Sequence, residues 1–81
     1  MTERIRAILK EHGRLPVEAA QLDESADLYN IGMTSHASVN LMLALEGEFE
    51  VEFPDRMLKR GVFQSIRSIR AALEELTAQR P

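Results

Sequence analysis

One serine stands out as a residue that could carry chemistry, because of the residues on either side of it. Ser35 follows Gly32 and Thr34, and a strongly apolar segment runs from Val39 to Phe49. Glycine permits a tight turn, and hydroxyl residues are favoured where a helix begins. A serine at that place lies beside unpaired backbone N–H groups and a partial positive charge, which favour a phosphate. We therefore interpret Ser35 as the attachment point of a phosphate-linked prosthetic group.

Two other roles for this serine are less favoured. It could be an ordinary helix cap, but the nearby glycine and the apolar surplus that follows favour an attachment site. A hydrolytic nucleophile normally has glycines two residues to either side, where this chain has Met33 and Ala37. His36 would point roughly 100° away from Ser35 on a helix, so it is poorly placed as a general base. His12 belongs to the apolar side of another helix, and we expect no catalytic residue.

Metal and nucleic-acid sites are also disfavoured. Two separated histidines without any cysteine match no common metal-ligand spacing. Asp23, Glu24 and Asp27 lack the pattern of a calcium loop, so we expect a solvated patch or helix caps. Four basic residues are scattered among acids without interleaved aromatic residues: Lys59, Arg60, Arg67 and Arg70. This pattern indicates an ordinary charged surface rather than a nucleic-acid site.

The composition is that of one small globular domain covering residues 1–81. Hydrophobic residues make up 44% of the chain and charged residues 28%, and the absence of cysteine excludes disulfides and thiolate chemistry. The net charge of −3 disfavours nucleic acid and favours basic partners. The longest apolar run is too short to cross a bilayer, and no signal segment opens the chain. We expect a cytoplasmic monomer that contacts neither membrane nor nucleic acid.

Periodic apolar residues predict helices. Thr2 is expected to cap a first helix that ends at Gly13 and buries Ile5, Ile8 and Leu9. A long, mostly irregular loop should follow over 15–31, with a short helix near 17–22 and three apolar anchors: Leu22, Leu28 and Ile31.

The second helix is expected over Ser35–Phe49. One stripe at helical spacing forms its natural core face: Leu41, Ala44, Leu45 and Phe49. Three further apolar residues fall outside that stripe: Val39, Met42 and Leu43. Either neighbouring segments enclose them, or they are exposed to a partner.

The rest of the chain predicts two more helices. Asp55 should cap a short helix over 56–60, with Met57 and Leu58 facing inward. Ser65 should cap a last helix with a clean apolar stripe: Ile66, Ile69, Leu73 and Leu76. Residues 77–81 are expected to form a frayed tail. The fold class is all-α, a bundle of three main helices and one short one.

The chain resembles the acyl carrier protein family. The resemblance is densest at Asp27-Leu-Tyr-Asn-Ile-Gly-Met-Thr-Ser35 and continues through Val39-Asn-Leu41 and Phe53-Pro-Asp55 into the last helix. It implies an acyl-carrier-protein-like fold and 4'-phosphopantetheine attached to Ser35 by a phosphopantetheinyl transferase, from coenzyme A. The family's usual Asp-Ser-Leu is altered here, because Thr34 and His36 flank the serine.

With these departures and its Gly-Met-Thr-Ser-x-Ala-Ser-Val pattern, the sequence resembles the aminoacyl carrier protein subgroup. That likeness implies a thioester-linked amino acid, supplied by an amino acid:carrier protein ligase that resembles a class II seryl-tRNA synthetase. A partner-facing surface would comprise Thr34, His36, Val39, Met42 and Leu43. The alternatives are a fatty-acyl or polyketide carrier served by acyl-transferring enzymes, and an unmodified interaction module of the same fold. A small hydrolase is the most distant alternative.

Overall fold

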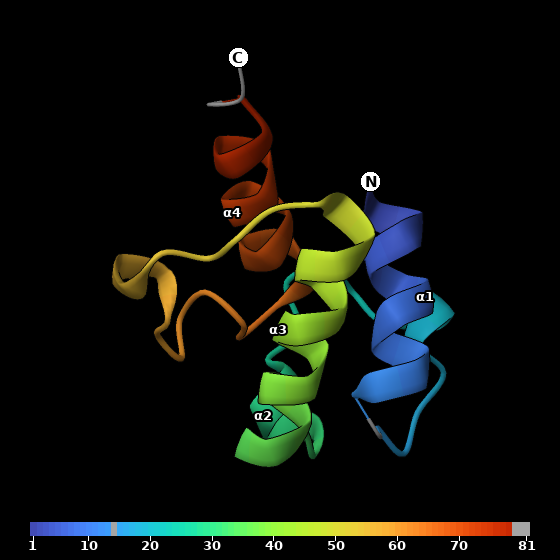
Figure 1. Cartoon of the computed structure of the whole chain (residues 1–81). Helices are drawn as coiled ribbons and strands as arrows, with labels where there is room; N and C mark the ends of the chain where they lie inside the picture. Colours follow the sequence, from blue (N-terminus) through green and yellow to red (C-terminus); the bar gives the residue numbers. More distant parts are fainter. Residues whose placement is uncertain (14, 79–81) are drawn as a thin grey trace.

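A computed structural model describes residues 1–13 and 15–78, and within these ranges the secondary structure is entirely helical. Three helices dominate: α1 (Thr2–His12), α3 (Ser35–Phe49) and α4 (Ile66–Ala78). Figure 1 shows α3 in the middle of the molecule, alongside α1, with α4 on another side. Three shorter elements lie in the connections: η1 (Ala19–Gln21), α2 (Leu28–Ile31) and η2 (Asp55–Met57). The predicted all-α bundle is confirmed.

The core forms where the three long helices meet. Each contributes most of the apolar stripe that its sequence predicts: Ile5, Ile8 and Leu9 from α1; Leu41, Leu45 and Phe49 from α3; Ile66, Ile69 and Leu73 from α4. The two other predicted members, Ala44 and Leu76, are half-buried and pack against this core. The connections add buried side chains, among them Leu28, Met33, Met57 and the edge-to-face pair of Phe53 and Phe63. Since the chain has few aromatic residues, aliphatic packing provides most of the hydrophobic stabilisation.

The loop between α1 and α3 contains more structure than expected. The short helix expected near 17–22 is a single 3-10 turn, η1, and α2 was not predicted. Arg6 fixes η1 to α1, because its Nη1 donates to the carbonyl oxygens of Ala19 and Leu22, each at 2.7 Å. Of the three expected anchors, Leu28 is fully buried, whereas Leu22 and Ile31 are half-buried.

Two predicted caps have different outcomes. Thr2 is the first residue of α1 and makes no cap bond; its hydroxyl accepts a hydrogen bond from Arg70 instead, at 3.0 Å. Ser65 does cap α4, since its hydroxyl accepts from the Ser68 N–H at 3.1 Å. The Ser68 hydroxyl accepts from the Ser65 N–H at 3.1 Å, so each residue satisfies the other.

The prediction for the segment after α3 is wrong in two respects. Asp55 makes no cap bond, and the expected helix over 56–60 is the three-residue 3-10 turn η2. Met57 is buried, but Leu58 is exposed. Consecutive side chains on such a turn point about 120° apart, so only one of the two faces the core.

The last helix continues further than expected. Thr77 belongs to α4, and its hydroxyl donates to the Leu73 carbonyl at 2.9 Å, so the predicted frayed tail does not begin there. The remainder of that prediction, residues 79–81, lies outside the described residues. Within the described part of the chain, none of the helices has the length and apolar character needed to cross a membrane.

Candidate functional site

Ser35 is the first residue of α3 and its side chain is exposed. The residue before it, Thr34, is the cap: its hydroxyl accepts from the Ala37 N–H at 3.0 Å, and its carbonyl accepts from the Ser38 N–H at 2.9 Å. The N–H groups of Ser35 and His36 precede the first intrahelical bond and point out of the helix end. The end of α3 therefore offers donors and a partial positive charge next to the Ser35 hydroxyl.

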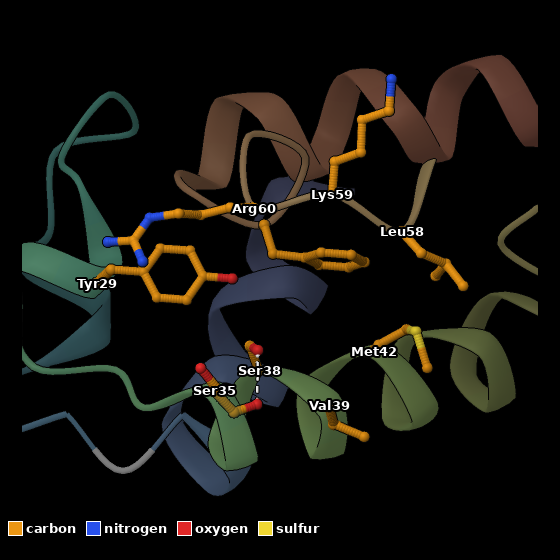
Figure 2. A pocket seen from close by; sticks show the side chains of 9 residues that line it. Tyr29, Ser35, Ser38, Val39, Met42, Leu58, Lys59 and Arg60 are labelled. Carbon is orange, nitrogen blue, oxygen red and sulfur yellow. Dashed lines mark hydrogen bonds between the residues drawn. The ribbon is translucent and has the colours of Figure 1, made fainter. Parts of the chain in front are cut away.

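Three hydroxyl groups lie at this helix end, and two are used within the helix. Thr34 forms the cap bond, and the Ser38 hydroxyl donates to the Ser35 carbonyl at 2.8 Å, the dashed line in Figure 2. The Ser35 hydroxyl takes part in neither bond. It is thus the hydroxyl of this group that is best placed to be modified.

The turn that leads into α3 depends on a glycine. Gly32 has φ +137° and ψ 5°, a backbone conformation that residues other than glycine rarely adopt. Its N–H donates to the Leu28 and Tyr29 carbonyls at 3.2 Å each, and the Met33 N–H donates to Leu28 at 2.9 Å. Met33 is buried. These bonds fix the direction from which the chain enters α3 and so orient Ser35.

A pocket of about 370 Å³ opens beside Ser35, between α2, the first half of α3 and the segment after η2. It is lined by both apolar and polar side chains: Tyr29, Ser35, Ser38, Val39, Met42, Leu58, Lys59, Arg60 and Phe63. Figure 2 shows the Tyr29 ring and the Ser35 side chain on the same side of this pocket. The Arg60 guanidinium lies over the Tyr29 ring, 4.2 Å from its centre. A flexible group attached to Ser35 would have this pocket next to it.

Asp27 ties two walls of the pocket together. Its carboxylate caps α2 by accepting from the N–H groups of Tyr29, at 3.0 Å, and Asn30, at 3.2 Å. Its other oxygen accepts from the Gln64 side chain at 3.0 Å, and the Leu28 N–H donates to the Gln64 carbonyl at 2.7 Å. The hydrogen bond from Asn30, followed by those from Gln64 and Tyr29 and by the charge of Arg60, lowers the pKa of Asp27 below its ordinary value.

We expect this carboxylate to make stability depend on pH in the acid range. Because the pKa of Asp27 is lowered in the folded state, its contribution is present above its unfolded pKa and is lost as the pH falls through the lower, folded value. Asp27→Asn should therefore be less stable than wild type at pH 7, and this difference should shrink as the pH falls below the unfolded pKa of an aspartate. Urea midpoints measured from pH 7 into this acid range test this.

Glu52→Gln removes one negative charge at an exposed position and serves as the control. A gap between wild type and Asp27→Asn that stayed constant over the same pH range would contradict the role given to the Asp27 charge.

The predicted partner surface is mostly exposed. Thr34, His36, Val39 and Leu43 are exposed, whereas Met42 is half-buried and packs against the core. The alternative for Val39 is enclosure by neighbouring segments, and the structure instead leaves its side chain open to solvent. Whether these residues contact a partner stays a prediction.

Several pocket residues were not identified from the sequence as site residues. They are Tyr29, Ser38, Leu58, Lys59, Arg60 and Phe63. Tyr29 could have been identified from the sequence, because it lies inside the Asp27–Ser35 motif. The pocket wall opposite Ser35 comes from a segment more distant in the sequence. For Lys59 and Arg60 the sequence indicates only ordinary surface charges. Among residues 1–13 and 15–78, no cluster of three histidine or acidic side chains could hold a metal ion.

Comparison with known proteins supports a site of this kind. The family described as "Phosphopantetheine attachment site" matches residues 3–76. The chain is 46% identical over 69 residues to the aminoacyl carrier protein of Agrobacterium fabrum, a match that covers 85% of this chain and 83% of that protein. The similarity thus includes the whole region from α1 into α4.

Two solved structures extend the similarity to the fold. One contains an engineered Bradyrhizobium japonicum glycine:carrier protein ligase complexed with carrier protein from Agrobacterium tumefaciens and AMP. Its matching chain has a TM-score of 0.89 and is 43% identical to this chain; the match covers 91% of this chain and 99% of that one. The other contains the Bradyrhizobium japonicum ligase complexed with glycylated carrier protein, with a TM-score of 0.74 and 28% identity, over 88% of this chain and 95% of that one. Sequence and fold therefore point to the same group of proteins.

Proposed function

This chain belongs to the phosphopantetheine-attachment family of carrier proteins, and from that membership we propose that Ser35 carries the 4'-phosphopantetheine arm and that the arm presents a thioester-linked amino acid to partner enzymes. The observation that carries the assignment to Ser35 is its exposed hydroxyl at the first residue of α3, while the neighbouring hydroxyls of Thr34 and Ser38 are engaged. Members of the family hold this arm covalently; it supplies the thiol on which the cargo is carried.

The residues around Ser35 fit such an arm. A phosphodiester on Ser35 would lie at the N-terminus of a long helix, where a negative charge is stabilised by about 0.3–1 kcal/mol. The pocket beside it offers apolar surface from Val39 and Met42 and polar groups from Tyr29 and Ser38. The chain contains no cysteine, so the thiol of the arm would be the one thiol available for acylation.

An amino acid is the cargo favoured by the relatives. The carrier from Agrobacterium fabrum is called an aminoacyl carrier protein, and the two solved structures described above are complexes with a glycine:carrier protein ligase. We propose the same kinds of partner for this chain: a phosphopantetheinyl transferase that attaches the arm and an amino acid:carrier protein ligase that loads it. The carrier acts in the cytoplasm as a monomer of one domain and performs no catalysis of its own.

The loading reaction tests the cargo. Carrier that has received the arm is incubated with a purified amino acid:carrier protein ligase, ATP and one amino acid at a time, and its intact mass is measured. We expect a small amino acid to be added and then released by hydroxylamine, as a thioester requires. Carrier without the arm and Ser35→Ala should gain nothing. A carrier that accepts fatty-acyl groups from an acyl-transferring enzyme but accepts none of the amino acids would favour the acyl-carrier alternative.

A further inference from the structure

Three apolar side chains gather on the surface beside Ser35. Val39 is 51% exposed and Leu43 is 55% exposed; they lie four residues apart and so share one face of α3. Leu58 is 48% exposed and borders the same pocket as Val39, from the opposite wall. We call these three residues the apolar patch. Exposed apolar side chains that adjoin one another mark an interaction surface.

The acidic residues of α3 are not available to a partner at this surface. Residues 35–45 contain no carboxylate. Glu46 lies about 16 Å further along the helix than Ser35, and its carboxylate accepts from the Phe53 N–H at 2.8 Å. Glu48 is still further away and binds the Arg4 guanidinium, whose Nε donates to it at 2.9 Å. Both acids thus serve contacts within the chain.

Positive charge, in contrast, adjoins the apolar patch. Lys59 and Arg60, which we call the cationic pair, follow Leu58 directly and are exposed. In the described part of the chain neither forms an ion pair, whereas Arg56 binds Glu75 at 3.2 Å. The cationic pair therefore makes the surface next to Ser35 locally positive, although the chain as a whole carries a net charge of −3.

The direction of the Lys59 side chain favours a protein over the phosphodiester of the arm as the group that it meets. Figure 2 shows this side chain pointing away from Ser35, whereas the Arg60 guanidinium lies over the Tyr29 ring. The Asp27 carboxylate is already engaged by backbone N–H groups and by Gln64. The charge of Lys59 is thus directed to the surroundings of the molecule.

We propose that the ligase which loads the arm docks with an apolar segment on the apolar patch and with flanking carboxylates on the cationic pair. This inference rests on the function proposed above and adds the chemistry of the partner's surface. It differs from what the net charge alone indicates, because the overall charge favours a basic partner whereas the surface beside Ser35 favours an acidic one. Such charge pairs at the rim of an interface act mainly on association and on the choice of partner.

The test measures binding of the purified ligase to the carrier without its arm, at low and at high ionic strength. Lys59→Glu should raise Kd about three- to tenfold at low ionic strength, and salt should reduce that ratio. Leu43→Ser should raise Kd at both ionic strengths, because it removes an apolar contact. Arg67→Glu is the matched control: it reverses an exposed charge on α4, away from the pocket, and should leave Kd within about twofold. Thermal unfolding checks that all variants stay folded.

The outcomes separate this proposal from the proposed function. The docking proposal is overturned if Lys59→Glu binds as tightly as wild type or more tightly, if the effect equals that of Arg67→Glu, or if the wild type does not bind the ligase. A concentration-dependent dimer that Leu43→Ser abolishes would assign the apolar patch to a second copy and would also overturn it. Charge-dependent binding without aminoacylation of the wild type would contradict the proposed function alone.

Discussion

Replacing Leu41 with alanine is expected to lower the free energy of unfolding by about 2–5 kcal/mol, the range for leucine-to-alanine changes in well-packed cores. Leu41 is fully buried at the middle of α3, where the helix packs into the core. Domains of this kind are stable by only about 5–15 kcal/mol, so a large part of the total is lost. Urea unfolding followed by circular dichroism measures the change.

Leu43 provides a matched control in the same helix. It is 55% exposed, so Leu43→Ala should change the free energy of unfolding by no more than about 0.5 kcal/mol. The two residues have the same side chain and the same secondary structure, and they differ in the face of α3 on which they lie. Equal losses of stability would mean that α3 is packed differently from the arrangement described above.

The second large effect is expected at Gly32. Gly32→Ala should lower the free energy of unfolding by about 1–3 kcal/mol, because the residue has φ +137°. An added Cβ would meet the Pro16 Cδ at 3.5 Å, an ordinary contact, so the cost arises from the backbone torsion. Since this turn leads into α3, the same change should slow attachment of the arm to Ser35. Chemical denaturation and the rate of transferase modification are the two measurements.

Gly47 gives the opposite expectation. It lies inside α3, and an added Cβ would meet no atom within 4 Å. Gly47→Ala should therefore raise the free energy of unfolding by about 0.5–1 kcal/mol, since alanine loses less conformational entropy in a helix. A Gly32→Ala variant as stable as Gly47→Ala would show that the positive φ is not required at position 32.

The long helices could be predicted because their apolar periodicity is regular over three or four turns. The bounds of α3 agree with the expectation, and the stripes of α1 and α4 are buried as predicted except for Leu76, which is half-buried. The four residues of α2 are too few to produce a periodic pattern, and the residue that specifies them, Asp27, had been interpreted only as a solvated acid or a cap. Short elements of this kind depend on capping bonds and tertiary contacts rather than on a repeating pattern.

The site was predictable in part, for a related reason. Ser35 and the hydroxyl-rich helix start are local features of the sequence. The opposite wall of the pocket is not a local feature, because Leu58 and Arg60 join Ser35 in lining it only after the chain has folded back. The hydrogen bond between Gln64 and Asp27 stabilises that arrangement. Leu58 was expected to face the core, since an apolar residue in sequence carries no sign of whether it is buried or exposed to a partner.

The assignment of the arm to Ser35 is tested most directly by the intact mass after incubation with coenzyme A, magnesium and a phosphopantetheinyl transferase. The wild type should gain one phosphopantetheine, and Ser35→Ala should gain none. Ser38→Ala is the matched control: it removes a neighbouring hydroxyl that is engaged within α3, so it should still be modified. Modification of Ser35→Ala, or none on the wild type by a transferase that is active on another carrier protein, would contradict the account.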